Sequence, residues 1–244
     1  MLLYYITDRL QFPGTETEQR RALLAKITEA ARAGVDYIQL REKDLHIRAL
    51  EQLTREAVAI VAKQNAKRDA ADPRRTALLI NSRIDVALAC GADGVHLTSS
   101  DLPASEARIL WSNSKDPRGT CSPIIAVSCH SVNDVESAAS HGADFAVLAP
   151  IFEKAQTGTP GIGLSALRAA TGLNRKADRR VESGDRRATI PVLALGGVTP
   201  GNAQVCLDSG AAGIAGIRLF QAADVQKTID AIRKGAFAGS AKRK

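Results

Sequence analysis

One short phrase occurs four times in the 244 residues, each time with a helical pattern before it and an apolar stretch after it. In each copy a Gly suits the left-handed position that follows a helix end, and the next residues lead directly into a strand. The phrase therefore marks the junction from helix to strand in a repeated strand–helix unit. The four copies are ARAGVDYIQL at 31–40, LACGADGVHL at 88–97, ASHGADFAVL at 138–147 and LDSGAAGIAG at 207–216.

The rest of the chain extends this unit to eight copies. Strict alternation of strands and helices predicts a parallel sheet, and eight units predict closure into a single (β/α)8 TIM barrel. An open doubly wound sheet is the alternative, but no G-x-G-x-x-G motif follows the first strand. We expect one α/β barrel domain over 1–235 and a disordered basic tail over 236–244. The expected strands lie at 2–8, 35–40, 76–81, 93–98, 123–129, 144–151, 190–196 and 212–219.

Composition limits the classes of function that the chain can have. Hydrophobic residues make up 45% and charged residues 24%, which is typical of a globular domain. No run of about 18 apolar residues is present, so we expect no membrane association and a cytoplasmic protein. The four cysteines lack C-x-x-C spacing, which predicts buried reduced thiols rather than disulfides or a zinc site.

The net charge of +7 raises the question of a nucleic-acid partner. The excess lies in 64–75, 174–188 and 227–244. Phe237 is the only aromatic residue in these segments, so they lack the aromatics interleaved with charges that a nucleic-acid platform would require. We therefore expect solvated loops and no nucleic-acid partner. The sequence leaves open whether the protein forms a homo-oligomer.

The polar insertions at 64–75, 112–122 and 174–188 each precede an expected strand. In a barrel they would lie on the face opposite the active site, which forms at the carboxyl ends of the strands. Polar residues and glycines gather at those strand ends. They are Thr7, Asp8, Gln39, Arg41, Lys43, Asn81, Ser82, Arg83, His96, Thr98, Asp101, Ser128, His130, Glu153, Lys154, Thr157, Gly196, Gly197 and Arg218.

The last two strand ends predict a phosphate site. ALGGVTP places Gly196 and Gly197 where the backbone can approach a ligand without a Cβ atom between them. The eighth strand then runs through Arg218 toward a helix beginning near AADV, and a helix N-terminus favours an anion. We expect a side chain added at Gly197 to weaken phosphate binding without disturbing the fold. A tight turn that requires glycine is the alternative.

The second strand predicts a further anion site. Gln39, Arg41 and Lys43 have the same parity, so their side chains share one side of the strand and its extension, which faces the barrel mouth. Two cations there suit a second phosphate or a diphosphate. A surface network of Arg41, Glu42 and Lys43 is the alternative.

The chain up to about residue 235 resembles the thiamine phosphate synthase/TenI family of barrels. Each matching motif is weak alone, but together they occur in order, one per strand. The resemblance implies an enzyme of thiamine biosynthesis with small phosphorylated substrates, in which a hydroxymethylpyrimidine diphosphate joins a thiazole phosphate and pyrophosphate is released. The motifs are YYITDR at 4–9, IQLREK at 38–43, INSRIDVALACGADGVHLTSSD at 80–101, AVSCHS at 126–131, GADFAVLAPIF at 142–152 and PVLALGGVTPGN at 191–202.

The resemblance also implies roles for individual residues. Ser128 would lie near the reacting pyrimidine, and Asp101 would bind Mg²⁺, whose charge together with Arg and Lys neutralises a departing pyrophosphate. The pyrimidine diphosphate would bind Gln39, Arg41, Lys43 and Asn81, and the thiazole phosphate would bind Gly197, Ile217 and Arg218.

Two departures from the synthase pattern leave the activity open. Ser82 stands where synthases usually carry an Asp that binds the metal. A single retained carboxylate weakens such a metal site without excluding it, and Glu153 or Asp8 could supply the missing charge. The loop EKAQTGTPG at 153–161 replaces a T-x-T-K loop.

The form N-S-R at 81–83 resembles TenI, the thiazole tautomerase branch, which needs no pyrophosphate or metal chemistry and in which His130 would be the acid and base. Because Gln39, Lys43 and Asp101 resemble the synthase, we expect synthase chemistry. A tautomerase and a non-catalytic protein that binds thiazole or thiamine phosphate are the alternatives.

Overall fold

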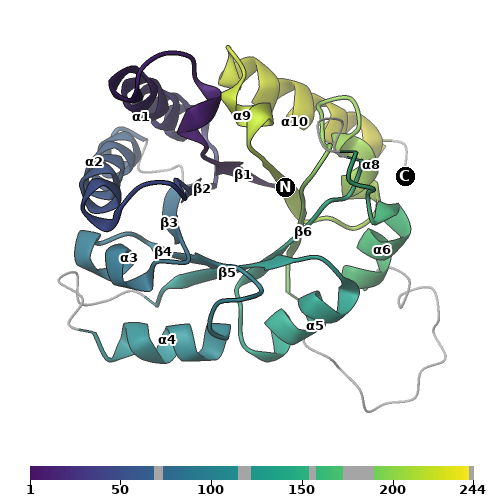
Figure 1. Cartoon of the computed structure of the whole chain (residues 1–244). Helices are drawn as coiled ribbons and strands as arrows, with labels where there is room; N and C mark the ends of the chain where they lie inside the picture. Colours follow the sequence, from purple (N-terminus) through teal and green to yellow (C-terminus); the bar gives the residue numbers. More distant parts are fainter. Residues whose placement is uncertain (69–73, 115–121, 154–157, 173–189, 242–244) are drawn as a thin grey trace.

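The structure is a computed structural model that describes residues 1–68, 74–114, 122–153, 158–172 and 190–241, with side chains through residue 235. Eight parallel strands follow one another in chain order and close into a barrel, because β8 pairs with β1. Helices surround the strands (Figure 1), and the single (β/α)8 barrel is confirmed. The strands are β1 (Leu2–Ile6), β2 (Tyr37–Leu40), β3 (Ala77–Asn81), β4 (Gly94–Leu97), β5 (Ile124–Cys129), β6 (Phe145–Leu148), β7 (Val192–Ala194) and β8 (Gly213–Gly216).

The helices alternate with the strands as the repeat predicts. The described helices are η1 (Arg9–Gln11), α1 (Glu16–Ala33), α2 (Ile47–Ala66), α3 (Ile84–Cys90), α4 (Ala104–Ser112), α5 (Val132–Ser140), α6 (Gly163–Ala170), α8 (Ala203–Asp208), α9 (Arg218–Gln221) and α10 (Val225–Ala241).

The repeated phrase forms the junction that its glycines predict. Gly34 and Gly91 follow α1 and α3 in the left-handed conformation, with φ of 84° and 68°, where a side chain would be strained. Each of these two helices therefore ends at its glycine, and the chain turns directly into the next strand.

Three copies of the phrase carry an Asp two residues after the glycine, and this Asp holds neighbouring strands together. Each carboxylate accepts the backbone N–H of a residue on the preceding strand. The bonds run from Leu3 to Asp36, from Leu78 to Asp93 and from Ile125 to Asp144, over 2.8, 2.8 and 2.7 Å.

Side chains fill the amino-terminal part of the barrel interior, and a cavity begins above them. Tyr4 lies 5.5 Å from Phe145 and 5.9 Å from Tyr37, measured between ring centroids, in a buried cluster that includes Leu193. The residues two positions further along these strands line a cavity instead, and they are Ile6, Gln39, Val147 and Leu195. Because side chains alternate along a strand, the aromatic cluster forms the layer next to the cavity on the amino-terminal side.

Some expectations fall partly or wholly outside the described residues. The insertions at 64–75, 112–122 and 174–188 contain undescribed stretches, so their placement relative to the site stays a prediction. α10 continues as far as Ala241, so the backbone is helical through most of the segment assigned to a tail. Residues 242–244 lie outside the description.

The cysteine and membrane expectations have clearer outcomes in the described part of the chain. Cys90, Cys129 and Cys206 are free and buried, as expected, and Cys121 lies outside the described residues. Among the described helices, none has the length and apolar character needed to cross a membrane.

Candidate active site at the carboxyl ends of the strands

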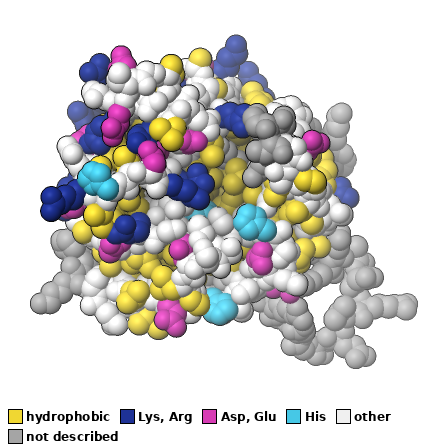
Figure 2. Space-filling model, viewed as in Figure 1, with side chains coloured by type: hydrophobic (Ala, Val, Ile, Leu, Met, Phe, Trp, Pro, Cys, Tyr) yellow, Lys and Arg dark blue, Asp and Glu magenta, His cyan; other side chains and the backbone are white. Residues whose placement is uncertain are grey.

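A cavity of about 790 Å³ lies at the carboxyl ends of the strands, within the size range of small-molecule sites. Figure 2 shows a hollow with hydrophobic side chains in the middle of the visible face, and Lys, Arg and His side chains lie along part of its rim. The cavity brings together every substrate-binding and catalytic residue predicted from the sequence. These are Gln39, Arg41, Lys43, Asn81, Ser128, His130, Gly196, Gly197, Ile217 and Arg218.

Three of the remaining strand-end residues also line the cavity, and they are His96, Thr98 and Glu153. Five do not line it, namely Thr7, Asp8, Ser82, Arg83 and Asp101. The other two, Lys154 and Thr157, lie outside the described residues. Several further lining residues were not singled out from the sequence. The polar ones are Gln11, Ser100 and Thr199, and the others are Ile6, Val147, Ala149, Leu195, Val198, Ala215, Gly216 and Leu219.

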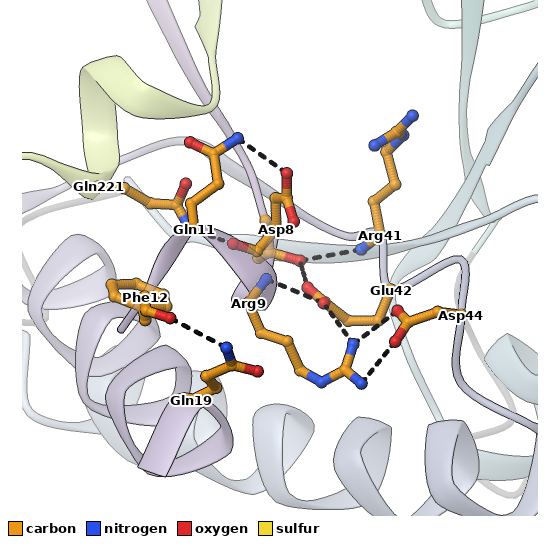
Figure 3. Close-up of polar contacts among 10 residues, drawn as sticks. Asp8, Arg9, Gln11, Phe12, Gln19, Arg41, Glu42, Asp44 and Gln221 are labelled. Carbon is orange, nitrogen blue, oxygen red and sulfur yellow. Dashed lines mark hydrogen bonds and ion pairs between the residues drawn. The ribbon is translucent and has the colours of Figure 1, made fainter. Parts of the chain in front are cut away.

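The segment after β2 sends alternate side chains to opposite sides. Arg41 and Lys43 line the cavity, whereas Glu42 is buried on the other side and accepts hydrogen bonds from the Thr7 hydroxyl at 2.6 Å and the Arg9 amide at 2.9 Å. Figure 3 shows the Arg41 side chain extending away from Glu42 and from the Arg9–Asp44 pair. The charge cluster is therefore two separate sets, and the surface network of Arg41, Glu42 and Lys43 is not formed.

Arg9 fastens this segment to the loop after β1. Its guanidinium is bidentate on Asp44, at 2.6 and 2.7 Å, and reaches Glu42 at 3.4 Å (Figure 3). These hydrogen bonds lower the pKa of Asp44. Burial raises the pKa of Glu42 and outweighs the opposing bonds from Thr7 and Arg9. The signal for this arrangement was present in YYITDR and IQLREK, but the sequence does not reveal which charges pair.

Arg41 and Lys43 both face the cavity. In the described part of the chain, neither side chain forms an ion pair with a carboxylate. Gln39 lies beside them, 1% exposed, and its amide nitrogen has no hydrogen-bond partner among the described residues. Buried donors normally find acceptors, so these three side chains indicate a ligand rich in acceptor oxygens.

A line of polar side chains runs beneath the cavity. The Tyr4 hydroxyl lies 2.9 Å from His96 Nδ1, and His96 Nε2 lies 2.7 Å from Ser128 Oγ. Burial, and then the charge of Arg41, lower the pKa of His96 to about 3, against a smaller opposing effect of Asp101. The His96 ring is therefore neutral at physiological pH.

Asp101 closes the loop after β4 and offers a metal only one carboxylate. Its Oδ2 accepts hydrogen bonds from Ser82 Oγ at 2.7 Å, Thr98 N at 2.6 Å and Thr98 Oγ1 at 2.9 Å. No group of three His, Cys, Asp or Glu side chains arranged for a metal occurs in the part of the chain that the structure describes. Asp101 does not itself line the cavity, but its neighbours Thr98 and Ser100 do. Because Mg²⁺ often binds one or two carboxylates together with substrate phosphates, Asp101 at the cavity edge fits an ion shared with a bound diphosphate.

The two glycines after β7 are required by the fold as well as by the cavity. Their φ angles are 92° and 66°. A Cβ atom on Gly196 would lie 2.7 Å from Pro150, and one on Gly197 would lie 2.7 Å from Phe152 Cβ and 2.9 Å from Glu153 O. The alternative reading of these glycines, a tight turn that requires glycine, therefore also holds. The expectation that a side chain at Gly197 would leave the fold intact is wrong, because the added atoms meet the loop after β6.

The helix at AADV does not point a bare N-terminus at the cavity. α10 begins at Val225, whose amide donates to Glu29 Oε1 at 2.9 Å, and Asp224 accepts from the Lys227 amide at 2.9 Å. The chain's own carboxylates thus cap this helix, which corrects the expected anion site there. The short α9 begins at the cavity instead, and Arg218 and Leu219 line its wall.

Comparison with known proteins agrees with this geometry. The family model described as thiamine monophosphate synthase matches residues 3–220. A thiamine-phosphate synthase of Methanoculleus marisnigri is 37% identical over 87% of this chain and 84% of its own, and one of Halalkalibacterium halodurans is 33% identical over 93% and 92%.

A solved structure shares both the fold and part of the sequence. Thiamine phosphate pyrophosphorylase from Pyrococcus furiosus superposes with a TM-score of 0.70 and 27% identity, covering 97% of this chain and 96% of that one. The match therefore extends over nearly the whole length of both chains. The chain belongs to the thiamine monophosphate synthase family.

Proposed function

We propose that the protein is a thiamine phosphate synthase, a transferase that condenses a hydroxymethylpyrimidine diphosphate with a thiazole phosphate to give thiamine phosphate and pyrophosphate. The observation that carries the proposal is the pair Arg41 and Lys43, which face the cavity and form no ion pair with any carboxylate of the described residues. A site for a tautomerase has no need of two such cations beyond its single substrate phosphate.

The pyrimidine diphosphate binds along β2 and β3. Arg41 offers a planar fork of donors and Lys43 a point charge to the diphosphate oxygens, while the buried amide of Gln39 donates a hydrogen bond. Asn81 lines the cavity beside them. When the bond to the pyrimidine methylene breaks, negative charge builds on the departing pyrophosphate, and the two cations stabilise it.

A divalent cation is the proposed cofactor. Asp101 would hold Mg²⁺ together with the diphosphate, and Glu153, which lines the cavity, is better placed than Asp8 to add charge. When bound, Mg²⁺ neutralises part of the charge on the leaving pyrophosphate.

The thiazole phosphate binds at the loops after β7 and β8. Gly196 and Gly197 expose backbone to the cavity, and Ile217 and Arg218 complete the wall. The two substrates thus share one cavity, where the thiazole nitrogen can approach the pyrimidine methylene carbon.

The test is to incubate the protein with both substrates and Mg²⁺ and to measure thiamine phosphate. Omission of either substrate is the control. Product that requires both substrates supports the proposal, and its absence at every Mg²⁺ concentration would refute it.

One observation favours a tautomerase as the second candidate. His130 lines the cavity, and the Ala149 carbonyl, which can only accept, lies 2.8 Å from its Nδ1. Nδ1 therefore carries a proton, and Nε2 can exchange one with a ligand. If the protein isomerises a thiazole phosphate, His130→Asn should abolish that isomerisation, and an undiminished rate would remove His130 from the reaction.

A further inference from the structure

Three hydrogen-bonded side chains connect the barrel core to the cavity. The Tyr4 hydroxyl meets His96 Nδ1 at 2.9 Å, and His96 Nε2 meets Ser128 Oγ at 2.7 Å. Tyr4 is 0% and His96 2% exposed, and Ser128 lines the cavity. Ser128 is therefore the end of this line of hydrogen bonds, and its hydroxyl lies at the cavity wall.

The Tyr4 hydroxyl determines which nitrogen of His96 carries the proton. Within the described part of the chain, its only hydrogen-bond partner is His96 Nδ1. If Nδ1 carried a hydrogen, the buried Tyr4 O–H would have no acceptor, which is costly. Tyr4 therefore donates to Nδ1, the ring proton resides on Nε2, and Nε2 donates to Ser128 Oγ.

The hydrogen bond from His96 determines what the Ser128 hydroxyl can do. Because its oxygen already accepts from His96, its own O–H proton can be directed only at another acceptor, and the described residues supply none. We propose that Tyr4 and His96 are positioning residues that hold Ser128 as a hydrogen-bond donor toward an acceptor atom of the bound pyrimidine diphosphate. The identity of that ligand rests on the proposed function.

The same geometry argues against His96 as a general base for Ser128. A base would need an unprotonated Nε2 that accepts the serine proton, and Tyr4 excludes this tautomer. A base must also hold the proton it removes, whereas burial and the charge of Arg41 lower the pKa of His96 to about 3. The imidazole is a fixed neutral donor.

The chain provides a matched pair of variants. Tyr4→Phe removes only the hydroxyl and keeps the ring that packs against Phe145 and Tyr37. Tyr5→Phe makes the same chemical change at the next residue, whose ring lies on the opposite side of β1 against Phe220. Both positions are fully buried, so a general effect of losing a buried hydroxyl would appear in both variants.

The first measurement determines which ring nitrogen of His96 carries the proton. Long-range ¹H–¹⁵N spectra of the labelled full chain without ligand report the protonation of each ring nitrogen, and His96→Gln identifies the His96 signals. We expect an unprotonated Nδ1 and a protonated Nε2 across about pH 5–8. We expect the Nδ1–H tautomer to become populated in Tyr4→Phe and not in Tyr5→Phe. A wild-type proton on Nδ1, an imidazolium in this range, or an unchanged tautomer in Tyr4→Phe would overturn the proposal.

The second measurement connects the tautomer to the ligand. In Tyr4→Phe, kcat/KM for the pyrimidine diphosphate should fall about tenfold, as loss of one oriented hydrogen bond implies. KM for the thiazole phosphate should not change, and Tyr5→Phe should retain wild-type values. An unchanged kcat/KM in Tyr4→Phe would overturn the role of Ser128. A wild-type protein without condensation activity would refute the proposed function. The spectra of the ligand-free chain would still show whether Tyr4 fixes the tautomer of His96.

Discussion

At the residue scale, the site is defined by which side of the chain each charge occupies. Arg41 and Lys43 face the cavity, and Glu42 and Asp44 face Arg9. Alternation along an extended segment predicted the first pair from parity alone. It could not predict the second, because Arg9 comes from another strand end and any carboxylate of suitable reach could have met it.

Lys43→Ala should lower the rate of condensation by roughly tenfold to a hundredfold, because a hydrogen bond from a charged group contributes about 1.5–3 kcal/mol. Steady-state kinetics with varied pyrimidine diphosphate would measure the effect. Lys63→Ala, at an exposed position of α2, is the matched control. Equal kinetics for the two variants would mean that the diphosphate binds elsewhere.

Ser82→Asp should tighten Mg²⁺ binding and raise the condensation rate. Ser82 has φ of 58°, a conformation that Asp tolerates better than most residues, and its hydroxyl already contacts the Asp101 carboxylate at 2.7 Å. Two carboxylates at this distance repel one another unless a cation lies between them. The Mg²⁺ concentration at half-maximal rate measures the effect, and an unchanged value would show that Asp101 does not bind the metal.

At the scale of elements, each strand end is held by contacts that the sequence shows only as a pattern. The repeated phrase predicted the strands and the helix ends, since its glycines occupy left-handed positions. The Asp within the phrase binds the neighbouring strand. Its role could not be predicted, because a carboxylate before a strand is equally compatible with a solvated turn.

Asp93→Ala should destabilise the barrel by about 1–3 kcal/mol, since the Leu78 amide would lose its acceptor. Urea unfolding of this variant beside Asp230→Ala, which removes an exposed carboxylate from α10, would measure the difference. Equal midpoints would show that water replaces the lost bond.

Asp44→Asn should show how the Arg9 contact depends on pH. Hydrogen bonds from Arg9 lower the pKa of Asp44 in the folded state, so its contribution is present above the unfolded pKa and disappears as pH falls through the folded pKa. Because Asp44 is half-exposed, the contribution should stay below about 1 kcal/mol. Unfolding of both proteins at neutral and acid pH tests this, and a difference that persists in strong acid would contradict it.

At the scale of the whole molecule, alternation and the count of eight units were sufficient to predict the barrel, and barrel geometry predicted the face that carries the site. Strand ends converge regardless of the details of packing, which is why Gln39, Asn81, Ser128 and Arg218 were identified from the sequence and do line one cavity. The contacts that loops make with one another could not be predicted from the sequence. The fit of Gly197 against Phe152 and the capping of α10 by Glu29 depend on tertiary structure alone.

We propose that the cavity joins two phosphorylated substrates and releases pyrophosphate. The most direct measurement is the ratio of pyrophosphate to thiamine phosphate formed when the wild-type protein is given both substrates and Mg²⁺. We expect equal amounts of the two products, each dependent on both substrates. Thiazole isomerisation without any pyrophosphate would contradict this proposal and assign the cavity to a tautomerase.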